Sequence, residues 1–209
     1  MSLEGKVCVV TGGSRGIGKA VAKKFADKGA SVVLAARTET NLRETVQEIR
    51  EVGNNCEYIP TDVTKEQEVK NLFETTCENF GRLDILVNSA GLGGQANSVV
   101  KTTLDEWEAV MDVNLRGVFL CCREAFSMMK EQKGGGKILN IGSTSSKMAS
   151  SPGKCAYRSS KHGLMGLSKS LLQEGKDEGI TVTVINPGHV KTSMLERAVR
   201  RDADKGTPE

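Results

Sequence analysis

The chain has 209 residues, 38% of them hydrophobic and 26% charged, and its formal net charge at pH 7 is only +3. This length is enough for one well-buried domain, which we take as residues 1–209, and the composition excludes a wholly disordered chain. Because the basic residues are scattered along the sequence, we expect no nucleic-acid partner.

The N-terminus and the cysteines indicate the compartment. Residues 7–10 form the first apolar run, which is too short for a signal-peptide core, and no later run approaches the length of a membrane span. The six cysteines are dispersed, without the Cys-x-x-Cys pairs or Cys/His clusters of a metal site. We therefore predict a cytoplasmic protein with reduced thiols, no metal site and no membrane association.

Strand-like runs alternate with amphipathic stretches from the N-terminus onward. Two stretches of helical pattern are GKAVAKKFADKG (residues 18–29) and NLRETVQEIREVG (41–53). Six runs read as strands: KVCVVTG (6–12), SVVLAAR (31–37), CEYIPTD (56–62), DILVNSAG (84–91), KILNIGS (137–143) and TVTVINPG (181–188). Such alternation requires right-handed crossovers, so we predict an α/β fold of the Rossmann type, with a doubly wound parallel sheet in three α/β/α layers.

A glycine-rich turn follows the first predicted strand. In VVTGGSRGIGKA, Gly12, Gly16 and Gly18 lie directly after the strand and at the start of a helix. Glycine at these places lets the turn tighten and lets the backbone approach a pyrophosphate, which the helix N-terminal amides then bind. Such turns also occur for purely structural reasons, but a position between a strand and an amphipathic helix favours a dinucleotide.

A long helix is predicted between the fourth and fifth strands. The segment TLDE (103–106) has the form of a capping box, so the helix should begin near Leu104 and run toward Gln132. Asn114 falls on its apolar stripe with Trp107, Val110, Met111 and Val118. A buried asparagine is therefore expected.

Tyr157 and Lys161 lie four residues apart in AYRSSKHG (156–163), a stretch that reads as the start of a helix. This spacing places both side chains on one helical face. A phenol has a pKa of about 10, and a nearby ammonium lowers it. The tyrosine is thus a candidate acid or base near neutral pH. The alternative is an ordinary aromatic and lysine pair at helical spacing.

Five ordered motifs resemble those of the short-chain dehydrogenase/reductase family. They are TGxxxGxG from Thr11 to Gly18, NSAG at 88–91, Asn114 in DVNLRG, the serines after ILNIG, and Tyr157 with Lys161. The chain is similar in type to 3-oxoacyl-carrier-protein reductases and broad carbonyl reductases. The resemblance implies hydride transfer between a nicotinamide dinucleotide and a small-molecule ketone or secondary alcohol, in a homo-oligomer when the chain is full length.

The resemblance implies four catalytic residues. Tyr157 would protonate the carbonyl oxygen, and Lys161 would lower the phenol pKa and hold the cofactor ribose. Asn114 would help to hold a water that passes protons; the alternative is that backbone groups satisfy its buried amide. The family's usual spacing to the tyrosine lands on Thr144, but alignment on the strand gives Ser143. We expect Ser143, because a loop accommodates one extra residue more easily than a buried strand does.

The end of the second strand bears on the choice of cofactor. Enzymes that prefer NAD usually carry an acidic residue here, whereas this chain has Ala36 and then Arg37, with Arg15 in the glycine-rich turn. Two guanidinium groups without a carboxylate suit a 2′-phosphate, so we predict NADP(H), with NAD(H) as the second choice. The alternative is that both arginines are only solvated.

The resemblance also implies the remaining cofactor contacts. Asp62 matches the family's aspartate near the adenine; the alternative is a solvated residue before the next helix. Val190 and Thr192 follow the NPG segment and would face the nicotinamide carboxamide. The full predicted cofactor set is Gly12, Ser14, Arg15, Gly16, Ile17, Gly18, Arg37, Asp62, Val63, Asn88, Ala90, Gly91, Tyr157, Lys161, Pro187, Gly188, Val190 and Thr192.

Two functions of different classes remain open. The first is an NADP-dependent oxidoreductase, and the second is a catalytically impaired dinucleotide-binding protein of the same fold that acts through partners. The intact set Asn114, Ser143, Tyr157 and Lys161 favours the enzyme.

The last residues read as the start of a helix, because Thr207 suits an N-cap and Pro208 the first helical position. Members of the family usually continue through one more helix and strand. We therefore expect a truncated chain.

Overall fold

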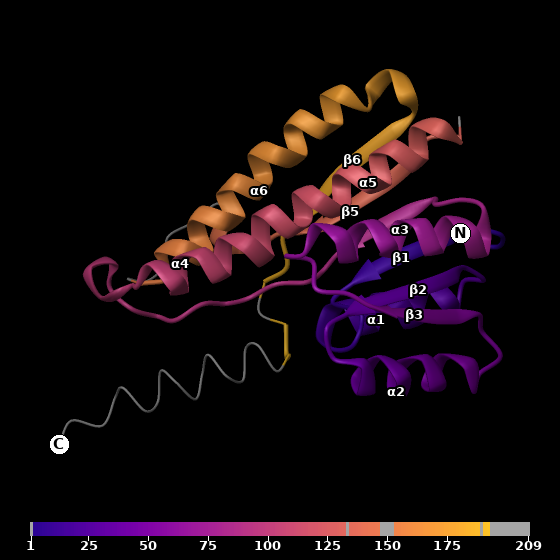
Figure 1. Ribbon diagram of the computed structural model, residues 1–209, viewed down its shortest axis with the longest axis horizontal. Helices are drawn as coiled ribbons and strands as arrows, with labels where there is room; N and C mark the ends of the chain where they lie inside the picture. The colour runs from indigo at the N-terminus through magenta and orange to yellow at the C-terminus, as the bar shows by residue number, and fades with distance from the viewer. Residues whose placement is uncertain (1, 133, 147–152, 189, 193–209) are drawn as a thin grey trace.

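A computed structural model describes residues 2–132, 134–146, 153–188 and 190–192 (Figure 1). The six predicted strands form one sheet in the order β3-β2-β1-β4-β5-β6, and every pairing is parallel. Their bounds are β1 (Val7–Thr11), β2 (Ser31–Ala36), β3 (Cys56–Pro60), β4 (Ile85–Asn88), β5 (Gly136–Ile141) and β6 (Ile180–Ile185). Because β1 pairs with both β2 and β4, the strand order reverses at this point.

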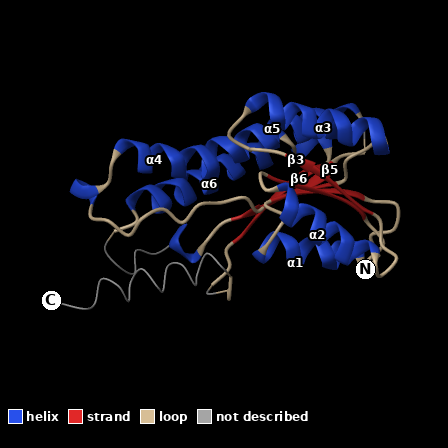
Figure 2. Ribbon diagram, turned by 60° about the horizontal axis from the view of Figure 1, so that its bottom comes forward, coloured by secondary structure: helices blue, strands red, loops and turns tan. Residues whose placement is uncertain are grey.

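Helices cover both faces of the sheet, as Figure 2 shows. They are α1 (Gly16–Ala26), α2 (Glu39–Arg50), α3 (Glu66–Phe80), α4 (Leu104–Met111), α5 (Gly117–Glu131) and α6 (Cys155–Glu174), with short 3-10 turns at Val99–Lys101, Thr144–Ser146 and Lys176–Glu178. One apolar core joins the sheet to α1 and α2, and a second joins it to α3, α5 and α6. The predicted doubly wound, three-layer architecture is therefore confirmed.

The central strand β1 shows why the apolar runs become buried strands. All of its residues are buried, with Cys8 and Val10 facing the core under α1 and α2 and Val9 facing the opposite core. Side chains alternate between the faces of a strand, so a strand covered on both faces reads as a continuous apolar run.

The predicted helix from Leu104 toward Gln132 is confirmed, but it contains a π-helical turn that the sequence did not indicate. It begins as expected, because Thr103 Oγ1 accepts from Glu106 N at 3.2 Å and the Glu106 carboxylate accepts from Thr103 N at 3.3 Å. A π-helical turn at Asp112–Arg116 then separates α4 from α5. Such a turn accommodates an extra residue, which a simple 3.6-residue pattern does not reveal. The predicted burial of Asn114 is nevertheless confirmed, since its exposed fraction is 0%.

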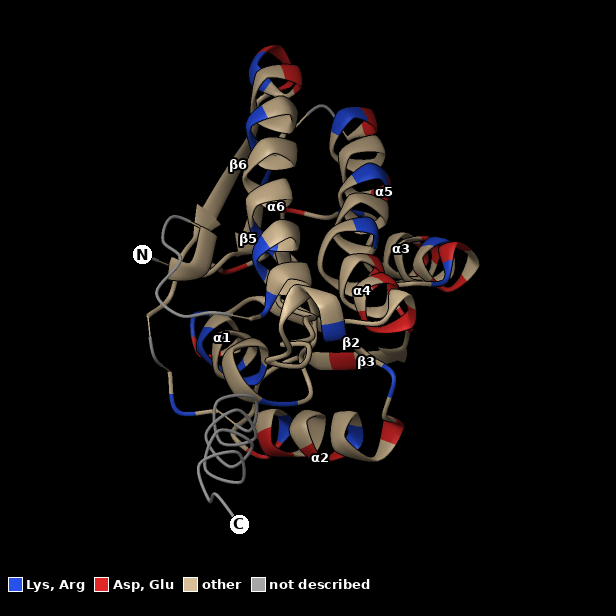
Figure 3. Cartoon of the chain, turned by 90° about the vertical axis from the view of Figure 1, so that its left-hand side faces the viewer, with Lys and Arg blue, Asp and Glu red and all other residues tan. Residues whose placement is uncertain are grey.

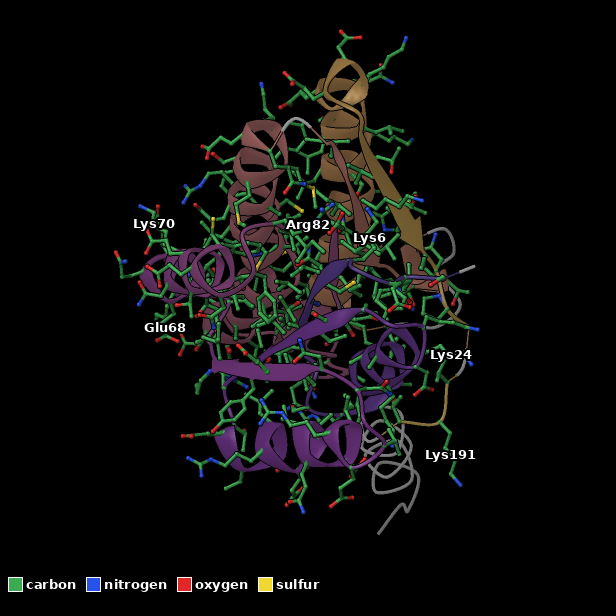
Figure 4. All side chains as sticks on the ribbon, turned by 90° about the vertical axis from the view of Figure 1, so that its right-hand side faces the viewer. Lys6, Lys24, Glu68, Lys70, Arg82 and Lys191 are labelled. Carbon is green, nitrogen blue, oxygen red and sulfur yellow. The ribbon has the colours of Figure 1, made fainter. Side chains whose placement is uncertain are left out.

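A charged cluster lies where β1 and β4 begin. Asp84 accepts hydrogen bonds from Lys6 Nζ at 2.9 Å, from two nitrogens of Arg82 at 2.6 and 2.7 Å, and from Val7 N at 3.0 Å. Figure 4 shows Lys6 and Arg82 close together. Burial alone would raise the pKa of Asp84, but the hydrogen bonds outweigh it and lower the pKa to about 2. This cluster links β1 and β4 at their amino ends. Ligands of such sheets bind at the opposite edge, at the carboxyl ends of the strands.

The cysteines and the surface charges do not gather into a further binding site within the described residues. Four cysteines are buried, and burial raises the pKa of Cys8, Cys56 and Cys122 to about 12. Within the described parts of the chain, no group of three or more metal-ligating side chains occurs. Lys and Arg are mixed with Asp and Glu on α2, α3 and α5 (Figure 3).

Among the residues that the structure describes, no helix is both long and apolar enough to cross a membrane. The helix start predicted at Thr207 lies outside the described residues.

Candidate active site

A pocket of about 610 Å³ lies at the carboxyl ends of the strands. Its walls come from the loops after all six strands, together with the facing sides of α4 and α6. Ligands of open parallel sheets bind at this edge, beside the point where the strand order reverses. The fold therefore places the pocket where a dinucleotide would bind.

Most of the predicted site residues line this pocket. The lining includes Gly12, Ser14, Arg15, Gly16, Ile17, Arg37, Asp62, Val63, Ala90, Gly91, Ser143, Tyr157, Lys161, Pro187, Gly188, Val190 and Thr192. Gly18, Asn88 and Asn114 do not line it and lie behind its walls.

The glycine-rich turn is shaped by close approach of the backbone. A Cβ at Gly18 would overlap the carbonyl oxygen of Gly12 and lie 2.8 Å from its carbonyl carbon. A Cβ at Gly12, where φ is +66°, would lie 2.7 Å from Ala90 N. Thr11 Oγ1 joins the two loops, since it accepts from the backbone N of Ser89 at 3.2 Å and of Ala90 at 3.3 Å. The backbone of this turn therefore forms a close-packed cradle, in which neither Gly12 nor Gly18 could carry a side chain without moving backbone atoms.

The start of α1 completes the cradle. The helix begins at Gly16, and its first turn contains no acidic residue, so no carboxylate neutralises the positive end of the helix dipole. A pyrophosphate suits this end of the helix. The residues present therefore fit the diphosphate of a dinucleotide.

Tyr157 and Lys161 both lie near the start of α6 and face the pocket. Lys161 Nζ lies 5.9 Å from the centroid of the Tyr157 ring and donates to Ile141 O at 2.7 Å. Burial lowers the pKa of Lys161 to about 8. The lysine is thus held between the tyrosine and the end of β5.

Ser143 lies two residues after the end of β5, and its conformation is fixed from two sides. Its Oγ accepts from Ser145 N at 3.1 Å, and its own N donates to Asn186 Oδ1 at 3.0 Å. Ser146 Oγ also donates to Asn186 Oδ1, at 2.9 Å, and to the Ser143 carbonyl. Thr144 lines the same pocket, so Ser143 as the catalytic hydroxyl stays a prediction.

Asn114 anchors the segment that follows β4. Its Oδ1 accepts from Leu92 N at 2.8 Å, and its Nδ2 donates to Leu92 O at 2.9 Å and to Ser160 Oγ at 3.1 Å. Both amide hydrogens are used, and the oxygen keeps one further acceptor site. The backbone of Leu92 and the hydroxyl of Ser160 therefore hold this side chain, and its role in holding a proton-carrying water stays a prediction.

A second buried asparagine connects the sheet to α6. Asn88 Nδ2 donates to Asn140 Oδ1 at 2.9 Å, and Asn140 Nδ2 donates to Ser168 Oγ at 2.9 Å. Asn140 and Ser168 were not predicted from the sequence as part of the site. The only available signal was a polar residue inside an apolar strand, KILNIGS. These contacts fix β4 and β5 relative to each other, just before the loops that line the pocket.

The predicted phosphate-binding arginines also line the pocket, from the loops that follow β1 and β2. Arg15 and Arg37 are both exposed, and neither forms an ion pair within the described chain. Asp62 is held by its neighbour, because its Oδ1 accepts from both the N and the Oγ1 of Thr64 at 3.0 and 2.9 Å. Its carboxylate is therefore fixed at the rim.

A model of the short chain dehydrogenase family matches residues 6–203. The chain belongs to this family. The resemblance found from five motifs is thereby confirmed, and this short-chain dehydrogenase/reductase is an oxidoreductase by family. Several pocket-lining residues were not predicted from the sequence, among them residues 92–96, Lys154 and the α4 residues Glu106, Ala109 and Val110.

Known relatives agree with this assignment. A 3beta-hydroxysteroid dehydrogenase of Mediterraneibacter gnavus is 38% identical over 193 residues, which cover 92% of this chain and 69% of the relative. A 3-oxoacyl-[acyl-carrier-protein] reductase of Synechocystis is 38% identical over 196 residues, covering 93% and 78%. The solved structure of a short chain dehydrogenase/reductase from Burkholderia phymatum in complex with NAD has a TM-score of 0.89 and 30% identity, covering 100% of this chain and 72% of that one.

Proposed function

We propose that this short-chain dehydrogenase/reductase transfers a hydride between NADP(H) and a small-molecule ketone or secondary alcohol. The observation that carries the proposal is that Ser143, Tyr157 and Lys161 line the same pocket as the glycine-rich turn. The nicotinamide, when bound, supplies or accepts the hydride. Protein side chains supply the proton and the orientation of the substrate.

Tyr157 gives its hydroxyl proton to the carbonyl oxygen of the substrate during reduction. Ser143 Oγ accepts a hydrogen bond from Ser145 N, which leaves its own hydrogen to donate to the same substrate oxygen. Lys161, with a pKa of about 8, carries its charge in most molecules at pH 7 and favours the phenolate of Tyr157. Water at the remaining acceptor site of Asn114 returns the proton from solvent.

NADP(H) rather than NAD(H) is supported by the charges at the adenosine end of the pocket. Arg15 and Arg37 are exposed there, and Ala36 stands where a carboxylate would contact the ribose 2′-hydroxyl. A 2′-phosphate would give both guanidinium groups a partner. The related enzyme from Burkholderia phymatum was solved with NAD, so both cofactors belong in the test.

The proposal keeps the other expectations from the sequence. They are a cytoplasmic location, self-association of the full-length chain, and neither nucleic acid nor membrane as a partner.

The test is oxidation of NADPH, and separately of NADH, with a panel of small ketones, diketones and β-keto thioesters. We expect turnover with NADPH, and its loss in Tyr157→Phe, while NADPH binding measured by fluorescence is retained because only the transferable proton is removed. Cofactor binding without turnover of any ketone would contradict the enzyme and support the dinucleotide-binding alternative. Turnover by Tyr157→Phe within tenfold of the parent would contradict the role of the tyrosine.

A further inference from the structure

The substrate end of the pocket is formed by two segments that pack on each other. Gly153 lies against the backbone of residues 96–97, where an added Cβ would be 3.1 Å from both Ala96 C and Asn97 O. Next to this contact, Thr102 Oγ1 lies 3.6 Å from Cys155 Sγ. The residue between Gly153 and Cys155 lines the pocket, three positions before Tyr157. That residue is Lys154.

Lys154 has a backbone conformation that its side chain disfavours. Its φ is +63° and its ψ is +32°, and within the described chain it is the only residue other than glycine with a positive φ. Two contacts hold it there, because Arg158 N donates to Lys154 O and Arg158 Nη1 donates to Gly153 O, each at 3.0 Å. Glycine would adopt this conformation more easily. Such outliers gather at functional sites, so the lysine side chain itself calls for an explanation.

The Lys154 ammonium has no charged partner in the described chain. Glu106 lines the same end of the pocket, but its carboxylate accepts from Thr103 N at 3.3 Å and from Asn97 Nδ2 at 3.3 and 3.4 Å. No ion pair joins it to Lys154. The first turn of α6 holds no acidic residue either. The Lys154 ammonium is therefore available to form an ion pair with a ligand bound at this end of the pocket.

We propose that Lys154 determines specificity by pairing with a carboxylate on the substrate, so that the preferred substrates are oxo acids or the corresponding hydroxy acids. This inference rests on the proposed function. Lys154 is the N-cap of α6 and lines the same pocket as Tyr157 in the first turn of that helix. The carboxylate is therefore expected within a few carbon–carbon bonds of the reacting carbonyl, and a series of acids of increasing length locates it.

The test compares kcat/KM for acetoacetate, levulinate and the next higher homologue with the values for their methyl esters. We expect the parent to prefer at least one acid over its ester. In Lys154→Gln, kcat/KM for that acid should fall tenfold or more, the effect of losing a charge-assisted hydrogen bond, while the values for the esters stay within about twofold. The loss should appear mainly in KM, because the pair forms in the bound substrate as well as in the transition state.

Two further variants separate charge recognition from a structural role. Lys169→Gln removes an exposed lysine from the same helix, outside the pocket, and should leave the acid-to-ester ratio unchanged. Lys154→Gly should unfold at a higher temperature than the parent, because it relieves the backbone, yet lose the preference for acids as fully as Lys154→Gln does. It also keeps the test informative if the glutamine variant folds poorly.

The inference is overturned if the parent prefers the esters throughout, or if acids and esters lose activity together in both Lys154 variants. If no ketone of either series is reduced, the proposed function fails instead. Calorimetric titration of acids and esters into the NADPH complex then decides the inference separately. Tighter binding of an acid that Lys154→Gln removes supports the lysine contact, and equal binding of acids and esters excludes it.

Discussion

Replacing Gly18 with alanine is expected to weaken both the fold and cofactor binding, through a single steric conflict. The added Cβ would overlap the Gly12 carbonyl oxygen, lie 2.8 Å from its carbonyl carbon and lie 3.2 Å from Gly13 N. These are backbone atoms, which cannot swing aside as the end of a flexible side chain can. The glycine-rich turn would have to open, and its amides would lose their positions around the pyrophosphate.

The size of the effect follows from this geometry. Overpacking a well-packed site costs about 1–3 kcal/mol, and in a chain of 150–250 residues each kcal/mol lowers Tm by roughly 2–4 °C. We therefore expect Tm to fall by about 2–12 °C in Gly18→Ala. The affinity for NADPH should fall at least tenfold, which corresponds to about 1.4 kcal/mol.

Gly166 provides the matched control. It lies in the interior of α6, is exposed, and has no atom within 4 Å of an added Cβ. Alanine there should stabilise the helix by about 0.5–1 kcal/mol without changing cofactor affinity. Thermal unfolding by circular dichroism and NADPH titration by fluorescence measure both variants. An unchanged Tm and affinity in Gly18→Ala would refute the reasoning, since the close approach would then impose no constraint.

Three other predictions concern the catalytic hydroxyl, the cofactor and pH. Ser143→Ala should lower kcat far more than Thr144→Ala in the ketone assay, and the reverse order would assign the catalytic role to the threonine. Arg37→Asp should weaken NADPH binding tenfold or more relative to NADH, because a charge-assisted hydrogen bond becomes a repulsion; equal binding of NADPH before and after would identify a merely solvated arginine. The pKa of Asp84 falls from 3.8 to about 2 on folding, so its stabilising contribution of about 2 kcal/mol is present above pH 4 and lost as pH falls through 2. Urea unfolding of the parent and Asp84→Asn should thus differ equally at pH 7 and pH 5 and converge below pH 4, and a difference that grows with acidity would contradict the linkage.

The strands were predictable because burial on both faces leaves a continuous apolar run, as β1 does in VCVVT. Asn114 could be placed because it interrupts an apolar helical stripe, and its burial is confirmed. The π-helical turn around it was not predictable. A π-helical turn changes the local hydrogen-bond spacing over one turn only, and the same run of apolar residues also fits an unbroken α-helix.

Some residues of the candidate site could likewise be predicted from the sequence, and others could not. The glycines, Tyr157 and Lys161 could be named because each belongs to a motif with a fixed spacing on one element. Lys154 could not be named as a pocket residue, because its place there depends on the packing of Gly153 against residues 96–97, which are far away in the sequence. Local pattern does not encode a contact of that kind. Asn140 escaped notice for a related reason, since its partners come from β4 and α6.

The position of β1 between β2 and β4 also governs how the chain folds during synthesis. Val9 pairs with Val33, 24 residues later, but its other neighbour, Leu86, is made 77 residues later. At about 5–20 residues per second, the ribosome needs roughly 4–15 s to supply that second partner. Once Val33 is made, and until Leu86 follows, β1 keeps one open edge in the nascent chain, which makes it a segment for chaperones to shield. The pairing that creates the ligand-binding edge is thus also the one of longest sequence separation, and non-local pairings of this kind slow folding.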